Sequence, residues 1–419
     1  MAIYLDHAAT SPMLPAVLAA YARALGVVGN PSSVHSQGQQ ARRMLEESRE
    51  QVAASVGSDS VEVTFTSGGT EAINLAVKGL YWARAPRTRI LVARSEHHAT
   101  IDSVEWLAAH EGAVIDWIPV DPLGRIDLDY LESALSNDVA LVTVLWANNE
   151  VGTIQPIADV VALAAAHDVP VHCDAVSAYG YLPIDFRASG LAALSISAHK
   201  IGGPVGIGAL IISRTATLTP LIHGGSQQRA RSGTQDAAGA VAFGVAAGLA
   251  AGAARVEGGA TPSAAGAAHV EGGATRLAAG LETGGPQSLR SLRELRDRLV
   301  AGIHSAVPEA VLRGDPVDRL PGNAHFTFPG CEGDSLLFLL DAAGFSVSTG
   351  SACQAGVPEA SHVLLAMGIP EGDARGALRF TLGHDTTEAE VEALVAALPA
   401  AVGQARRAGY ADRDVSLGR

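Results

Sequence analysis

Short hydrophobic runs alternate with segments of helical pattern between about residues 60 and 213. The runs read VEVTF, RILVA, AVIDWIPV, ALVTVLW, VPVHCDA, AALSIS and IGALIIS. Such alternation predicts βαβ units, in which helices cover a largely parallel sheet. Because ligands of these sheets bind beyond the carboxyl ends of the strands, we expect functional residues where the runs end.

The pattern changes after about residue 286. The segments LRSLRELRDRLVAGI, AHFTFPG, GDSLLFLLDAAGF, GALRFTLG and TTEAEVEALVAAL predict a smaller α+β domain. We therefore expect a large domain over residues 15–250, a small domain formed by residues 1–14 and 286–404, and a flexible tail over residues 405–419.

A low-complexity segment, residues 251–285, separates the two expected domains and contains an imperfect repeat, AARVEGGAT followed by AAHVEGGAT. It has too few large apolar residues to build a core, which predicts a surface insertion or a flexible connector. Residues 237–254 are uncharged and about as long as the shortest membrane-spanning helices. Their Ala and Gly content instead favours a packed helix of a soluble protein, so we expect no membrane contact.

Composition narrows the classes of partner. The formal charge of −14 argues against a broad basic face for nucleic acid and favours small substrates or protein partners. Cys173, Cys331 and Cys353 have no CxxC spacing, which argues against a disulfide framework and a structural zinc site, and we expect no metal. The segment MAIYLDHAAT lacks a basic stretch followed by an apolar one, so a cytoplasmic location is expected.

Lys200 is the first candidate for chemistry. It lies in SISAHKIGGPVGIG, where glycines permit close backbone approach and Ser197 and His199 add hydrogen-bonding groups. A partly desolvated lysine amine is a nucleophile toward aldehydes, as in Schiff-base enzymes. Taken alone, Lys200 is better explained as a surface lysine on a loop, where most lysines lie.

Two further elements give Lys200 a context. The segment FTSGGTEAINLAVKGL predicts a strand end, a turn and a helix, whose free N–H groups and the Thr70 hydroxyl suit a phosphate. Asp174 ends an apolar run, where it is either a cap or the partner of a buried cation such as a pyridinium nitrogen. An amine, a carboxylate and a phosphate nest on one sheet together predict pyridoxal 5'-phosphate as the cofactor.

Between about residues 3 and 400 the chain carries, in order, the motifs IYLDHAAT, GNPSSVH, FTSGGTEAINLA, SEHHAT, NNEVGT, CDA, SAHK, RSGT, STGSAC and LRFTLG. In this order they resemble the cysteine desulfurases of the pyridoxal-phosphate-dependent class V aminotransferase group. The resemblance implies an α/β protein of PLP-dependent transferase fold type I, with a mostly parallel seven-stranded sheet in the large domain. It also implies conversion of L-cysteine to L-alanine, with the sulfur transferred to an enzyme cysteine as a persulfide.

The resemblance implies a role for each matched residue. Lys200 corresponds to the lysine that binds the cofactor covalently, Asp174 to the carboxylate on the pyridinium nitrogen, and His97 to the imidazole stacked on the ring and suspected of proton transfer. Arg379 corresponds to the residue that binds the substrate carboxylate, a task that suits a bidentate guanidinium. The other implied contacts are Asn149 near the ring hydroxyl and the substrate, and Gly69, Thr70, Ser177, Ser197 and His199 around the phosphate and the ring.

Cys353 distinguishes sulfur chemistry from the other reactions of this cofactor. The surrounding SVSTGSACQAGVPEA is small, polar and loop-like, which suits an exposed thiol that travels to the cofactor, whereas a buried structural thiol is the alternative. The resemblance implies that Cys353 forms the persulfide, and it assigns no role to Cys173 or Cys331.

The resemblance also implies partners. Thr234 corresponds to a phosphate contact that the second subunit donates, so a homodimer with shared sites is expected. The sulfur acceptor is expected to be an iron-sulfur scaffold or a tRNA-thiolation enzyme. Two positions depart from the family pattern: Ser177 stands where a Gln is usual, and the loop before Thr234, which includes Arg231, is one residue shorter.

Other functions stay open at this point. A selenocysteine lyase or an aminotransferase would use the same cofactor and most of the same residues. A non-catalytic scaffold would keep the fold and the dimer while the repeat insertion binds a partner. The combination of Lys200, Asp174, His97, Cys353 and Arg379 favours the desulfurase.

Overall fold

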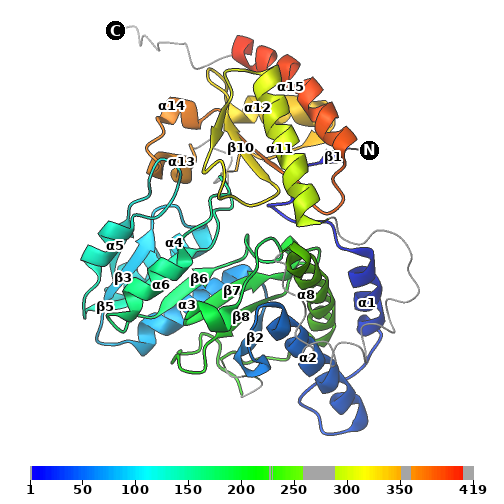
Figure 1. Ribbon diagram of the computed structural model, residues 1–419. Coiled ribbons are helices and arrows are strands. Elements are labelled where there is room, and N and C mark those ends of the chain that lie inside the picture. Colours follow the sequence, from blue (N-terminus) through cyan, green and yellow to red (C-terminus); the bar gives the residue numbers. More distant parts are fainter. Residues whose placement is uncertain (1, 226–227, 229, 258–287, 351–359, 409–419) are drawn as a thin grey trace, which may run out of the picture.

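The computed structural model of the chain describes residues 2–225, 228, 230–257, 288–350 and 360–408. Two parts are stacked one above the other (Figure 1). The large lower part contains a seven-stranded sheet, and the small upper part contains a three-stranded sheet, a two-stranded sheet and the helices that cover them.

All seven hydrophobic runs form strands of the large sheet. The strands are β2 (Val63–Thr66), β3 (Arg89–Ala93), β4 (Val114–Ile118), β5 (Val139–Leu145), β6 (Val171–Asp174), β7 (Ala193–Ser197) and β8 (Gly208–Ile212). They lie in the order β2-β8-β7-β6-β5-β3-β4, and only the pairings of β8 with its two neighbours are antiparallel. The prediction of a mostly parallel seven-stranded sheet is therefore confirmed.

Helices cover both faces of this sheet, as the βαβ pattern requires. They are α1 (Pro15–Leu25), α2 (Ser36–Ser55), α3 (Gly69–Ala83), α4 (His98–Glu111), α5 (Leu128–Ala134), α6 (Ile157–Ala165), α7 (Phe186–Ser189) and α8 (Ala237–Glu257), with single 3-10 turns at Ser60–Glu62 and Ala198–Lys200.

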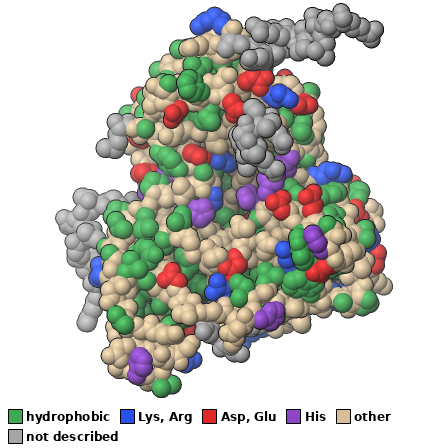
Figure 2. Space-filling model, turned by 180° about the vertical axis from the view of Figure 1, so that it is seen from behind, with side chains coloured by type: hydrophobic (Ala, Val, Ile, Leu, Met, Phe, Trp, Pro, Cys, Tyr) green, Lys and Arg blue, Asp and Glu red, His purple; other side chains and the backbone are tan. Residues whose placement is uncertain are grey.

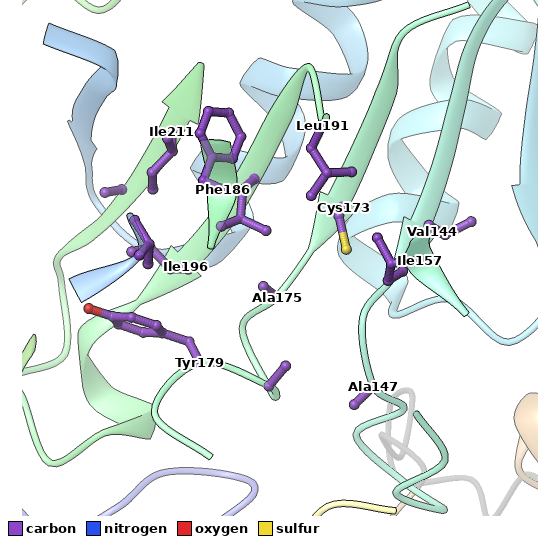
Figure 3. Packing of buried hydrophobic residues seen from close by; sticks show 14 of the residues in the cluster. Val144, Ala147, Ile157, Cys173, Ala175, Tyr179, Phe186, Leu191, Ile196 and Ile211 are labelled. Carbon is purple, nitrogen blue, oxygen red and sulfur yellow. The ribbon is translucent and has the colours of Figure 1, made fainter. Parts of the chain in front are cut away.

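The core of the large part lies on the two faces of the sheet. On the face shown in Figure 3, strand residues such as Val144, Ile196 and Ile211 pack against Ile157 and Phe186. On the other face, α3 and α4 pack their apolar sides against the sheet. This double covering makes the strand ends rigid positions for functional side chains.

The small part combines the N-terminal strand with the C-terminal third of the chain. Its elements are β1 (Ile3–Tyr4), α11 (Leu289–Ala306), β9 (Val311–Arg313), β10 (Asn323–Thr327), α12 (Gly333–Ala342), β11 (Phe345–Ser346), α13 (His362–Ala366), α14 (Glu371–Ala374), β12 (Ala377–Thr381) and α15 (Glu388–Ala408). β1 pairs in parallel with β11, and Leu5 joins a core made by α11, α12, α15 and the sheet.

Two helices extend into segments that were predicted to be irregular. α8 continues to Glu257, so the described residues include the beginning of the expected insertion, and the repeat from residue 258 onward lies outside them. α15 continues to Ala408 and includes the first residues of the expected tail.

The apolar segment 237–254 lies within α8, where Ala240, Phe243 and Ala247 are buried in the core of the large part. None of the helices in the described ranges is long and apolar enough to cross a membrane. Within the same ranges, His, Cys, Asp and Glu side chains form no group of three that could hold a metal ion.

Candidate active site

A cavity lies where the two parts of the molecule meet. Asn149, Ser177 and Lys200 line it from the large part, and His7 and Asn323 line it from the small part. Figure 2 shows histidine side chains gathered along this boundary. The cavity lies beyond the carboxyl ends of β5, β6 and β7, where a ligand site is expected in a sheet of this kind.

Lys200 lines the cavity, and backbone carbonyls hold its amine. β7 ends at Ser197, and one 3-10 turn then carries the chain to Lys200. Its Nζ donates to the backbone carbonyls of Ala8 and Ala9, the latter at 2.9 Å. Burial lowers the pKa of Lys200 to about 8, and the positive charge of Arg379 acts in the same direction. The amine is therefore partly neutral near physiological pH, as a nucleophile requires.

Asp174 lies buried at the end of β6, where its Oδ1 accepts a hydrogen bond from the Val176 N–H at 2.9 Å. Burial raises the pKa of Asp174 to about 6, although this hydrogen bond and the charge of Lys200 oppose the rise. The carboxyl group is thus mostly ionised at pH 7 and can pair with a cationic ring nitrogen.

Glu96 is a second carboxyl group next to this site, and the sequence analysis missed it. It is fully buried, and its Oε1 accepts from the Leu145 N–H at 2.7 Å. Burial and the charge of Asp174 raise the pKa of Glu96 well above its ordinary value. The raised pKa means that a second negative charge beside Asp174 is disfavoured.

His97 is the N-cap of α4. The Ala99 N–H donates to its Nδ1 at 3.0 Å, so the neutral ring carries its proton on Nε2. Burial lowers the pKa of His97 to about 4, with a further contribution from the charge of Lys200. His97 is therefore neutral at pH 7.

The turn at the start of α3 has the features of a phosphate cradle. A Cβ on Gly69 would lie 2.8 Å from the Val176 side chain, so only glycine fits there. The Ser197 hydroxyl is buried and has no hydrogen-bond partner among the described residues. Free helix N–H groups and an unpartnered hydroxyl together suit a phosphate. Thr70 lies exposed in the same helical turn, and the His199 Nδ1 lies 3.3 Å from the Thr10 Oγ1.

These groups fit pyridoxal phosphate on three counts. Lys200 offers a low-pKa amine for the aldehyde, Asp174 offers a carboxylate for the ring nitrogen, and the Gly69 turn with Ser197 offers a phosphate cradle. Burial lowers the pKa of His199 to about 4, so this neighbouring ring is neutral as well.

Arg379 reaches the site from β12 in the small part. Its guanidinium pairs with Asp6 Oδ1 at 2.8 Å and donates to the Asn149 carbonyl at 2.9 Å. Its buried Nε has no partner in the described part of the chain. The structure thus brings Arg379 and Asn149 together, and Asp6 joins them although the sequence analysis gave it no role.

The structure does not bring Thr234 into this group and does not describe Cys353. Thr234 lies exposed in the loop before α8 and is not among the residues that line the cavity. Cys353 lies outside the described residues. Ser177 lines the cavity beside Asn149 and Lys200.

His7, Tyr181 and Asn323 also line the cavity, although none of them was predicted from the sequence. Tyr181 and Asn323 are single polar residues in segments whose local pattern carries no sign of chemistry. His7 stands inside the motif IYLDHAAT, next to the two carbonyls that hold Lys200, and its position in that motif was the only available signal.

Comparison with known proteins identifies similar chains. The family model for aminotransferase class-V matches residues 3–394. An IscS-like cysteine desulfurase of Mycobacterium tuberculosis is 50% identical over 97% of this chain and 98% of its own length. The cysteine desulfurase NifS of Azotobacter vinelandii is 36% identical over 96% of this chain and 93% of its own length.

Solved structures show the same fold. A NifS-like protein superimposes with a TM-score of 0.82 at 30% identity, covering 96% of this chain and all of its own (100%). SspA in complex with cysteine superimposes with a TM-score of 0.74 at 28% identity, covering 92% of this chain and 100% of its own.

Proposed function

This chain belongs to the cysteine desulfurases within the aminotransferase class-V family, and from that premise we propose that it converts L-cysteine to L-alanine and transfers the sulfur to Cys353. The observation that carries the proposal is the convergence of Lys200, Asp174 and His97 at one sheet edge, opposite Arg379. Bound pyridoxal phosphate supplies the electron sink for the bond changes at the substrate carbons.

Lys200 holds the cofactor and then moves the Cα proton of the substrate. Its lowered pKa makes both tasks possible, because the neutral amine is the nucleophile and the base. His97, neutral and with its proton on Nε2, is placed to assist this transfer. Asp174 keeps the ring nitrogen protonated through its negative charge.

Arg379 and Asn149 orient the substrate. The guanidinium offers two parallel N–H donors for the cysteine carboxylate, and its Nε is already buried and unpartnered among the described residues. Asp6 fixes the orientation of the guanidinium from the side.

The sulfur step is a nucleophilic attack of the Cys353 thiolate on the substrate sulfur. A bond forms between the two sulfur atoms while the substrate Cβ–Sγ bond breaks, and its electron pair stays with the carbon. Protons at Cβ and Cα complete L-alanine, and Cys353 remains as a persulfide. No external oxidant is needed, because the carbon is reduced as the sulfur is oxidised.

The persulfide sulfur passes to an acceptor such as an iron-sulfur scaffold or a tRNA-thiolation enzyme, in the cytoplasm. We place this reaction in a homodimer, because Thr234 is exposed and outside the cavity of its own chain, as a residue donated to a partner's site must be.

The test measures sulfide and alanine released from L-cysteine with a reductant, while the visible absorbance of the cofactor is followed. We expect Cys353→Ala to lose sulfide release and to keep the absorbance. Cys331→Ala is the matched control, because Cys331 is a buried thiol whose pKa is raised by burial, and it should keep full activity. Unchanged sulfide release from Cys353→Ala would show that another group takes the sulfur.

A further inference from the structure

Glu150 is a buried carboxyl group that the reaction described above does not use. It follows Asn149 in the loop after β5 and is only 3% exposed. The Asn148 Oδ1 accepts from its N–H at 2.8 Å, and the Asn323 Nδ2 donates to its carbonyl at 3.0 Å. Contacts to both parts of the molecule therefore fix the backbone of Glu150.

The Glu150 carboxyl group contacts the chain just after the segment that carries Cys353. Glu150 Oε2 accepts a hydrogen bond from the hydroxyl of Ser361, which is 2% exposed and also caps α13 through the Leu364 N–H. The next residue, His362, donates from Nε2 to the Glu96 carbonyl at 2.8 Å, one residue from His97. This end is thus attached to Glu150 and Glu96, which are the chain neighbours of Asn149 and His97.

The chain just before the Cys353 segment reaches the same carboxyl group. A Cβ added to Gly350 would lie 3.5 Å from Glu150 Oε2 and 3.3 Å from the Nε2 of His325. His325 is fully buried, and neither of its ring nitrogens has a hydrogen-bond partner in the described ranges. Two residues earlier, the Ser348 carbonyl accepts from the Arg379 N–H at 2.6 Å.

We propose that Glu150 is a positioning residue for Cys353: its carboxyl group fixes the point to which the chain returns at Ser361, beside the point from which it departs at Gly350. The inference rests on the proposed role of Cys353. Fixing the ends of a short segment limits the volume that its thiol explores, which raises the thiol's effective concentration at the substrate sulfur. Glu150 acts through Cys353 and does not itself touch the substrate.

The experiment uses the full-length holoenzyme in a single turnover with L-cysteine and no reductant. The persulfide on the Cys353 peptide is quantified by alkylation and mass spectrometry, and the rate is expressed per cofactor-loaded site. The variants are Glu150→Gln, Ser361→Ala and the double variant, with Ser361→Thr as the conservative rescue. Glu294→Gln is the matched control, since Glu294 forms an exposed i,i+4 ion pair with Arg290 on α11.

We expect each single variant to slow persulfide formation by about tenfold, since each weakens one buried hydrogen bond. The rate of the double variant should lie within about twofold of the rates of the single variants, because both substitutions affect the same contact. Ser361→Thr, which keeps the hydroxyl and the cap, should recover most of the rate lost in Ser361→Ala. Cofactor absorbance and KM for cysteine should match those of Glu294→Gln. Ser361→Ala should also lower Tm, because it removes the cap of α13.

Three results would overturn the inference: an unchanged rate in both single variants, effects that multiply to about a hundredfold in the double variant, or a rate loss that is proportional to the loss of bound cofactor. Cys353→Ala in the same series separates this inference from the proposed function. Full sulfide release from Cys353→Ala contradicts both, whereas an inactive Cys353→Ala beside a fully active Glu150→Gln contradicts the role of Glu150 alone.

Discussion

The two walls of the cavity hold their functional side chains by different means. On the large-part wall, Lys200, Asp174 and His97 each lie within four residues of a strand end, and main-chain groups orient all three. On the small-part wall, Arg379 is oriented by Asp6 and by the Asn149 carbonyl. Asp174 and His97 are thus oriented within the large part, and Lys200 adds one contact across the domain boundary, to the Ala8 and Ala9 carbonyls. The orientation of Arg379, in contrast, depends on such a contact through the Asn149 carbonyl and on Asp6.

The largest effect is expected at the centre of the large-part wall. Lys200→Ala removes both the covalent attachment of the cofactor and the base, so sulfide release should fall by at least about a thousandfold. Activity is measured at saturating pyridoxal phosphate, with cofactor content determined separately. If Lys200→Ala retained a tenth of the native activity, the assignment of cofactor attachment and proton transfer to the large-part wall would be wrong.

Arg379→Lys tests the small-part wall alone. The ammonium group keeps the charge and loses the paired donors, so KM for cysteine should rise by about thirtyfold while the cofactor absorbance stays native. Steady-state kinetics and a cofactor titration give the two values. If cofactor affinity fell as much as substrate affinity, the separation of the walls would be wrong.

Gly69→Ala tests the phosphate cradle. The added Cβ would lie 2.8 Å from Val176 Cγ2, so the turn must shift, and cofactor affinity should weaken by about tenfold. KM for cysteine in the cofactor-loaded variant should stay within about twofold of the native value, because the substitution does not contact the substrate-binding residues of the small part. Gly248→Ala on α8 is the control, because an added Cβ there meets nothing within 4 Å.

The smallest expected effect is the pH dependence of cofactor loading, which involves residues of both walls. Burial lowers the pKa of Lys200 to about 8, and Arg379 contributes from the opposite wall. The neutral amine that attacks the aldehyde is therefore half formed at about pH 8, and the rate of cofactor loading should rise only about twofold from there to its plateau. Stopped-flow absorbance measures this rate. A rate that keeps rising tenfold per pH unit beyond pH 9 would indicate an ordinary lysine.

The large-part wall was the more predictable one, for a physical reason. Its seven strands and their ends are visible as local hydrophobic patterns, so Lys200 and Asp174 could be placed from the sequence alone. The fold then brings these strand ends to one edge without further information.

The small-part wall could not be predicted in the same way. Asp6, His7 and Asn323 reach the site through contacts between segments hundreds of residues apart, and local patterns do not encode such contacts. Glu96 and Glu150 are buried carboxyl groups, and a sequence offers no sign that a given Glu is buried. Cys353, which only the resemblance could identify, stays a prediction.

The pairing of β1 with β11 joins Ile3 to Phe345, so β1 can pair only after the chain has been synthesised as far as β11. Contacts of such high contact order form late in folding, because a long loop must close before they stabilise the chain. The carbonyls of Ala8 and Ala9 follow β1 directly and hold the Lys200 amine. On the ribosome, the large sheet can form while the nucleophile still lacks these partners, and the lysine reaches its final environment only when the small part closes over it.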